Sequence, residues 1–102
     1  VLHVLDGLRG VMQGGPGARR PENVWEHKTL WLATDPVAMD RIGWEVVDSK
    51  RVEKGLPKVA HAEPMQGGSF VNRQPEHIEI AGALGLGVLN KDKIDLRRFP
   101  LS

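Results

Sequence analysis

The sequence lacks cysteine and tyrosine, carries almost no excess of either charge, and has no long apolar run. The absence of cysteine excludes disulfides, thiolate zinc sites, cysteine-ligated iron–sulfur clusters and a cysteine nucleophile within these residues. Fourteen Lys and Arg against thirteen Asp and Glu leave a formal net charge of +1, which argues against a nucleic-acid binder. No apolar run approaches the roughly 20 residues that a membrane span needs.

What is present is typical of one small globular domain covering residues 1–102. The hydrophobic share is 40% and the mean hydropathy is −0.31, which indicates a folded, soluble chain. The chain opens directly on the apolar stretch Val1–Leu5. We therefore expect a C-terminal fragment of a longer chain, with an upstream domain of the same protein as its neighbour. The compartment stays open between the cytoplasm and export as a prefolded protein.

Glycine and proline residues mark the limits of the predicted strands, loops and helices. Residues 1–5 and 28–34 are predicted strands, and the Gly/Pro-rich residues 8–23 between them are a predicted irregular loop. A helix is predicted over 36–54, with Asp35 as N-cap, Pro36 at its first position and Gly55 as its stop. The apolar spacing gives this helix a buried face, formed by Met39, Ile42, Gly43, Val46 and Val47.

Two further elements are predicted towards the end of the chain. Beyond a second irregular region, residues 56–74, Pro75 opens a short helix that ends at Gly85-Leu86-Gly87. Residues 93–99 alternate apolar Ile94 and Leu96 with polar neighbours, which indicates a last strand or extended segment. The expected fold is α/β: a small, mostly three-stranded sheet layered by two helices, with long Gly/Pro-rich loops.

Several short sequence motifs together resemble the C-terminal part of the domain of unknown function 362 family. They are Leu5-Asp6-Gly7 with Gly14-Gly15-Pro16-Gly17, Ala33-Thr34-Asp35-Pro36-Val37-Ala38-Met39-Asp40, Gly55-Leu56-Pro57, Gln74-Pro75-Glu76-His77-Ile78, and Leu84-Gly85-Leu86-Gly87. The resemblance covers nearly the whole chain. It implies no assigned activity, but some family members carry iron–sulfur segments or twin-arginine export signals. It therefore implies a redox setting, with any iron–sulfur cluster on an upstream segment or a partner and no cofactor within this chain.

Three acidic residues are the main candidates for chemistry. Asp35 and Asp40 are predicted catalytic residues, although helix capping also accounts for Asp35 and a solvated helix surface for Asp40. Asp6 and Thr34 are predicted ligand-binding residues, with a turn-forming Asp-Gly as the alternative for Asp6. If the first two strands are parallel, Asp6 and Asp35 share one edge of the sheet, where open α/β sheets bind ligands.

The glycine loop is the other candidate. Gly14, Gly15, Pro16 and Arg19 are predicted to cradle an anion through backbone N–H groups and a guanidinium, with a plain surface loop as the alternative. The loop does not match a P-loop, because no Gly-Lys-Ser/Thr follows. The four histidines form no His-x-x-x-His pair, and the sequence assigns no metal.

Two functions stay open at this point. The first is an enzyme or binding domain for an anionic or metal-bridged small molecule, with its pocket at the carboxyl ends of the first two strands. The second is a non-catalytic structural or interaction module that completes the core of a larger protein. Neither involves nucleic acid or a membrane span.

Overall fold

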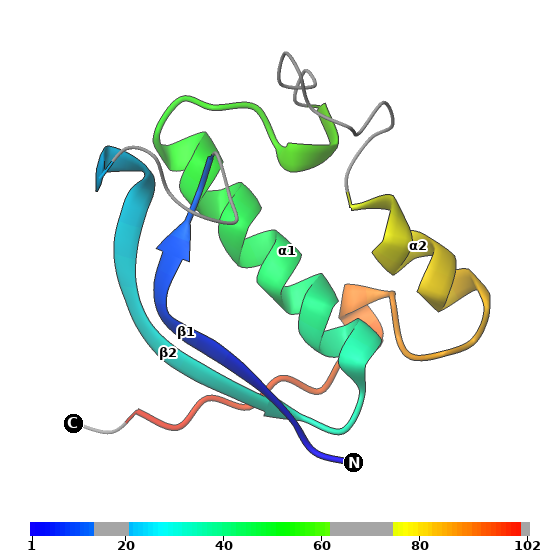
Figure 1. Cartoon of the computed structure of the whole chain (residues 1–102). Helices are drawn as coiled ribbons and strands as arrows, with labels where there is room; N and C mark the ends of the chain where they lie inside the picture. The colour runs from blue at the N-terminus through cyan, green and yellow to red at the C-terminus, as the bar shows by residue number, and fades with distance from the viewer. Residues whose placement is uncertain (14–20, 62–74, 101–102) are drawn as a thin grey trace.

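The protein is a two-stranded antiparallel hairpin covered on one face by a long helix (Figure 1). The computed structural model describes residues 1–13, 21–61 and 75–100. Strand β1 spans His3–Val11 and β2 spans Val24–Ala33, with the short 3-10 turn η1 at Pro21–Asn23 before β2. Helix α1 spans Pro36–Glu53 and α2 spans Glu76–Ala83, with 3-10 turns at Val59–His61 and Lys91–Lys93.

The position of helix α1 confirms the helix predicted from the residues at its ends, Asp35 and Gly55. The side chain of Asp35 caps it by accepting from the backbone N–H of Ala38, and Pro36 occupies its first position. Beyond its C-cap, Gly55 adopts φ +79°, a conformation that glycine enters without strain. Met39 and Ile42 are buried as expected, together with Val37 and Ala38.

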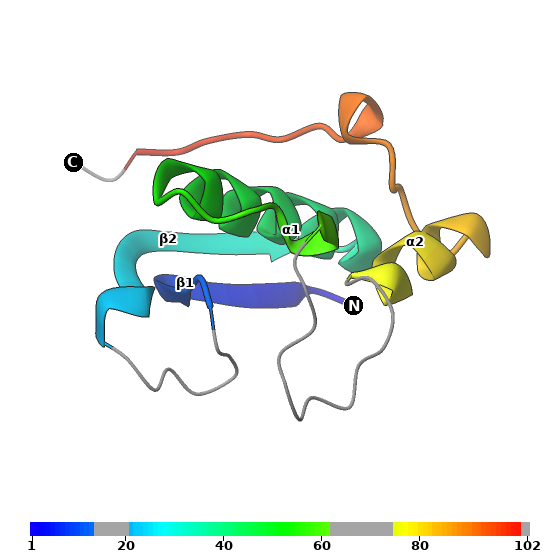
Figure 2. The same cartoon turned by 90° about the horizontal axis from the view of Figure 1, so that it is seen from above.

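The described sheet differs from the prediction in strand number and extent, and it settles the strand direction, which the sequence left open. Residues 94–100 form no strand, so the described sheet has two strands, and the expected third is not confirmed. The pairing is antiparallel, with His3 opposite Ala33 and Asp6 opposite Leu30. In Figure 2 the C-terminal segment runs on the other side of α1 from the hairpin, which leaves Ile94 and Leu96 without a neighbouring strand.

Both strands are also longer than predicted. β1 extends to Val11 through Gly7 and Gly10, which resemble turn residues in the sequence. A side chain at either position would collide with an indole ring from β2: a Cβ on Gly7 would lie 2.9 Å from Trp31 Cε3, and one on Gly10 would lie 2.6 Å from Trp25 Cζ2. These glycines are therefore strand residues that make room for tryptophans.

The two faces of the hairpin have opposite environments. Half-buried residues alternate with exposed ones along both strands, and α1 lies against the half-buried face. The other face exposes the aliphatic side chains of Val4, Leu8, Leu30 and Leu32, each between 53% and 67% accessible. This face is open because, among the described residues, the sheet has a single helix layer on its other face.

Arg51, near the end of α1, is a buried charged residue. It is 7% exposed, and its guanidinium donates to the carbonyl oxygens of Met12 and Pro57, both at 2.7 Å. Asp48 accepts from the backbone N–H of Val59 at 2.8 Å. Arg51 thus joins the end of β1 to the segment that follows α1.

We expect Arg51→Met to lower the free energy of unfolding by about 2–4 kcal/mol, because the buried carbonyl of Met12 and the partly buried carbonyl of Pro57 lose a charged donor. Urea denaturation followed by tryptophan fluorescence measures this loss. The exposed neighbour Lys54 provides the matched control, since Lys54→Met should change stability by less than about 0.5 kcal/mol. Equal effects of the two substitutions would contradict the assigned role of Arg51.

Candidate functional site

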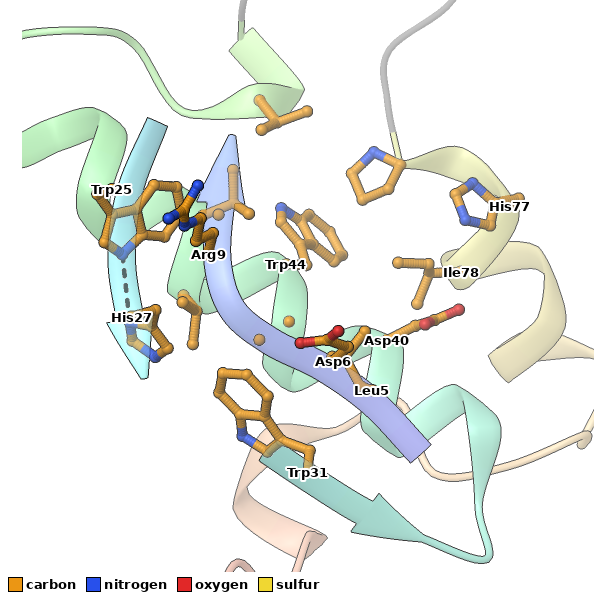
Figure 3. Close-up of a pocket in the computed structure, with 17 residues that line it drawn as sticks. Leu5, Asp6, Arg9, Trp25, His27, Trp31, Asp40, Trp44, His77 and Ile78 are labelled. Carbon is orange, nitrogen blue, oxygen red and sulfur yellow. Dashed lines mark hydrogen bonds between the residues drawn. The ribbon is translucent and has the colours of Figure 1, made fainter. Parts of the chain in front are cut away.

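A cavity of about 370 Å³ lies between the half-buried face of the hairpin, α1 and the start of α2 (Figure 3). Its size is within the range of small-molecule sites. Apolar and aromatic side chains form most of its wall, with a few charged groups among them. The lining residues are Leu5, Asp6, Gly7, Arg9, Gly10, Trp25, His27, Trp31, Asp40, Gly43, Trp44, Val46, Val47, Val59, Pro75, His77 and Ile78.

Three aromatic side chains from β2 form one wall of the cavity. The rings of His27 and Trp31 are stacked, with centroids 5.2 Å apart and planes 8° apart. Trp25 meets the other side of His27 edge-on, and its Nε1 donates to His27 Nδ1 at 3.2 Å. Because Nδ1 accepts this bond, neutral His27 carries its proton on Nε2. The wall is held by stacking, by this hydrogen bond and by the glycines of β1 beneath it.

Helix α1 supplies the second wall. Gly43, Val46 and Val47 belong to its predicted buried face, and they are only half-buried because the cavity lies beside them. Trp44 lies next to them, with the guanidinium of Arg41 4.6 Å from its ring centroid. Its indole Nε1 is buried and has no acceptor among the described residues.

Two of the predicted acidic residues line this cavity together. Asp6 comes from the middle of β1 and Asp40 from the first turns of α1, and Figure 3 shows both beside the cavity. Asp6 Oδ1 accepts from the backbone N–H of Leu8 at 3.1 Å, close to the irregular pairing between Gly7 and Arg9. Asp40 is exposed, and within the described residues it makes no hydrogen bond or ion pair. Of the two carboxylates, Asp40 is therefore the one whose oxygens accept no hydrogen bond from the described residues.

Asp35 lies away from the cavity and ties two parts of the fold together. Its Oδ1 accepts from Ala38 N at 3.0 Å and its Oδ2 from Val88 N at 2.8 Å, which joins the start of α1 to the segment after α2. Gly87 permits this contact, because a Cβ there would lie 2.9 Å from Asp35 Cγ. Burial raises the pKa of Asp35, but hydrogen bonds from the backbone N–H groups of Ala38, Val88 and Val37, with nearby His3, outweigh it and lower the pKa overall.

This lowered pKa predicts a pH dependence of stability. A carboxyl group whose pKa is lower in the folded state stabilises the fold above its unfolded value, here 3.8, and this contribution is lost as the pH falls through the folded value. We expect the free energy of unfolding to fall more steeply below about pH 4 in the native protein than in Asp35→Asn, which keeps a capping side chain. Parallel urea titrations between pH 7 and pH 2 measure the two slopes. Identical slopes would show that Asp35 is not responsible.

The antiparallel pairing separates residues that the sequence analysis placed together. The carboxyl ends of β1 and β2 lie at opposite ends of the hairpin, so Asp6 and Asp35 do not share one edge. Thr34 is exposed and does not line the cavity. Gly14, Gly15, Pro16 and Arg19 lie outside the described residues. The proposed anion cradle and the catalytic role of Asp35 therefore stay predictions.

The aromatic wall is the part of the site that the sequence analysis missed. The positions of Trp25 over Gly10 and of Trp31 over Gly7 depend on the register of the hairpin. The residue opposite Trp25 is Gly10 and the residue opposite Trp31 is Leu5, with Gly7 beside it, and nothing local in the sequence indicates these partners. Within residues 1–13, 21–61 and 75–100, no group of three or more His, Cys, Asp or Glu is arranged to hold a metal ion.

Comparison with known proteins adds nothing to this geometry. No family model, curated protein or solved structure matches the chain. Among the described residues, no helix is long and apolar enough to cross a membrane.

Proposed function

We propose that this chain is a small-molecule-binding domain whose ligand occupies the cavity between the hairpin, α1 and α2. The observation that carries the proposal is a cavity of about 370 Å³ with a wall of stacked aromatic rings and two carboxylates on its lining. Aromatic rings favour a flat or apolar ligand body. Carboxylates favour a hydrogen-bond donor or a positive charge at one end of that ligand.

The possibility of enzymatic activity rests on Asp40. An exposed carboxylate beside an apolar cavity is suited to accept a proton from a bound ligand. The anionic or metal-bridged ligand expected from the sequence depends on the glycine loop, and the redox setting depends on the family resemblance. These remain separate proposals, which the same binding experiment addresses by including inorganic phosphate and Mg²⁺.

Three compounds test which charge the cavity prefers in a ligand: 2-phenylethylamine, 2-phenylethanol and phenylacetate. Each has a phenyl ring on a two-carbon chain, and they differ in the charge of the terminal group. We expect the amine to bind most tightly and Asp40→Asn to weaken it by about three- to tenfold, since a charged partner is replaced by a neutral one. Calorimetry and thermal shift measure this. Asp92→Asn is the matched control, because Asp92 is exposed and lies outside the cavity lining.

The results separate the alternatives. Equal binding of the amine and the acid would contradict the role of the two carboxylates. Failure of all three molecules, of phosphate and of Mg²⁺ would contradict the small-molecule proposal. Binding of phosphate alone, unaffected by Asp40→Asn, would favour the glycine loop instead.

An interaction module is the second candidate, and the outer face of the hairpin favours it. Four aliphatic side chains, Val4, Leu8, Leu30 and Leu32, lie exposed on one small sheet. Asp6 lies between Val4 and Leu8 on this face and opposite Leu30, so the exposed surface is aliphatic with one carboxylate residue among its members. An exposed cluster of aliphatic side chains is typical of a surface that meets another protein.

A further inference from the structure

Strand β1 is an edge strand with one side open. It pairs with β2 only, and the described residues contain no strand on its other side. Its nine residues span about 30 Å of extended backbone. Part of their N–H and C=O groups points away from β2, and a row of such groups is a template for another strand. The Leu8 N–H is excepted, because it donates to Asp6 Oδ1.

The first half of β1 has little of the usual protection against edge pairing. Proteins guard edge strands with lysine, proline, charged side chains or strong irregularities. His3–Val11 contains neither lysine nor proline, and its irregular pairing lies between Gly7 and Arg9, so the stretch from His3 to Gly7 is regular. β2 differs, because it carries Lys28 in a left-handed conformation, φ +55°, beside Glu26. Of the two strands, β1 is therefore the one suited to accept a neighbour.

The cavity extends along the open side of β1. Three consecutive β1 residues, Leu5, Asp6 and Gly7, line it together with Arg9 and Gly10. Neighbouring residues of a strand point to opposite faces, and the exposed Asp6 lines the cavity beside the half-buried Leu5 and Gly7, as expected for a cavity that is open towards the edge of the strand. β2 contributes only the long side chains of its half-buried face.

We propose that the open edge of β1 binds an extended segment of a partner protein as a third strand. Backbone hydrogen bonds to β1 supply affinity, and the cavity receives alternate side chains of the added strand. The other side chains of that strand extend the aliphatic outer face next to Val4 and Leu8. The cavity lining carries two acidic residues, Asp6 and Asp40, against one arginine, Arg9, and this excess favours a lysine or arginine in the bound segment. This inference develops the interaction role and requires no small-molecule ligand.

The test uses a fluorescein-labelled, eight-residue peptide of alternating valine and threonine with one central lysine. We expect saturable binding by fluorescence anisotropy, and slower hydrogen exchange at β1 amides but not at β2 amides. Methylating alternate backbone nitrogens of the peptide on its pairing side preserves every side chain. This change should weaken binding at least tenfold, because it removes the donors that pair with β1.

Charge provides the second comparison. Replacing the lysine of the peptide by glutamate, or Asp40 by asparagine, should weaken binding about three- to tenfold, whereas Asp92→Asn should leave it unchanged. Equal binding of the methylated peptide, or protection at β2 alone, would overturn the proposal. So would a concentration-dependent dimer that protects β1 without any peptide, because the occupant would then be a second copy. Failure of the peptide with retained binding of 2-phenylethylamine would reject the added strand and leave the proposed function intact.

Discussion

Gly7→Ala is expected to destabilise the protein by about 2–3 kcal/mol, in the upper range for overpacking a fitted site. The added Cβ would lie 2.7 Å from the carbonyl oxygen of Thr29 and 2.9 Å from Trp31 Cε3. One contact is with backbone on the paired strand, and the other is with a ring that stacks on His27. Neither can move without disturbing the hairpin or the cavity wall. Urea denaturation followed by circular dichroism measures the loss.

Two comparisons isolate the cause. Gly43→Ala adds the same methyl group in the middle of α1, where its nearest neighbour is Leu5 Cδ2 at 3.5 Å, an ordinary contact. We expect that substitution to be neutral or to stabilise by up to about 1 kcal/mol, because alanine favours helix more than glycine does. In a Trp31→Ala background the cost of Gly7→Ala should fall by at least about 1 kcal/mol. Strict additivity would show that Trp31 does not cover Gly7.

Gly87→Ala is expected to cost about 2–4 kcal/mol, for a different reason. Its Cβ would lie 2.7 Å from Val37 Cβ and 2.9 Å from Asp35 Cγ, so the segment after α2 must move away from the start of α1. That movement breaks the bond from Val88 N to Asp35 Oδ2 and adds the cost of a crowded contact. Urea denaturation reports the loss, and a weaker pH dependence below about pH 4 should accompany it, since Asp35 loses a donor.

Gly85 provides the control for this substitution. It also belongs to the segment after α2, and its φ of +76° disfavours alanine, but a Cβ there has no neighbour within 4 Å. Gly85→Ala should therefore cost about 1–2 kcal/mol from backbone strain alone and leave the pH dependence unchanged. Equal costs and equal pH profiles for the two variants would show that Gly87 serves the backbone and not Asp35.

The helices were predictable because their signals are local. Asp35, Pro36 and Gly55 mark the limits of α1 through hydrogen bonds and dihedral angles that depend on a few neighbouring residues. Pro75 and Gly85 do the same for α2. The strands were less predictable, because Gly7 and Gly10 have the same local signature in a turn and under a tryptophan ring.

The candidate site shows the same division. Asp6 and Asp40 were singled out from the sequence, and they line one cavity, but their roles there remain proposals. Asp35 was singled out with them, and its two oxygens hold α1 and the segment after α2 together instead. The aromatic wall was missed because tryptophan in a strand has the same pattern whether it fills a core or borders a cavity.

The sequence by itself determined the class of the domain, the position and ends of both helices, and the exclusion of cysteine chemistry. These follow from composition and from interactions within a few residues. Only the tertiary structure decided that the strands are antiparallel, that Arg51 is buried, and which carboxylates line the cavity. Strand direction and burial depend on contacts between residues far apart in the chain, where one shift of register exchanges the buried and exposed faces.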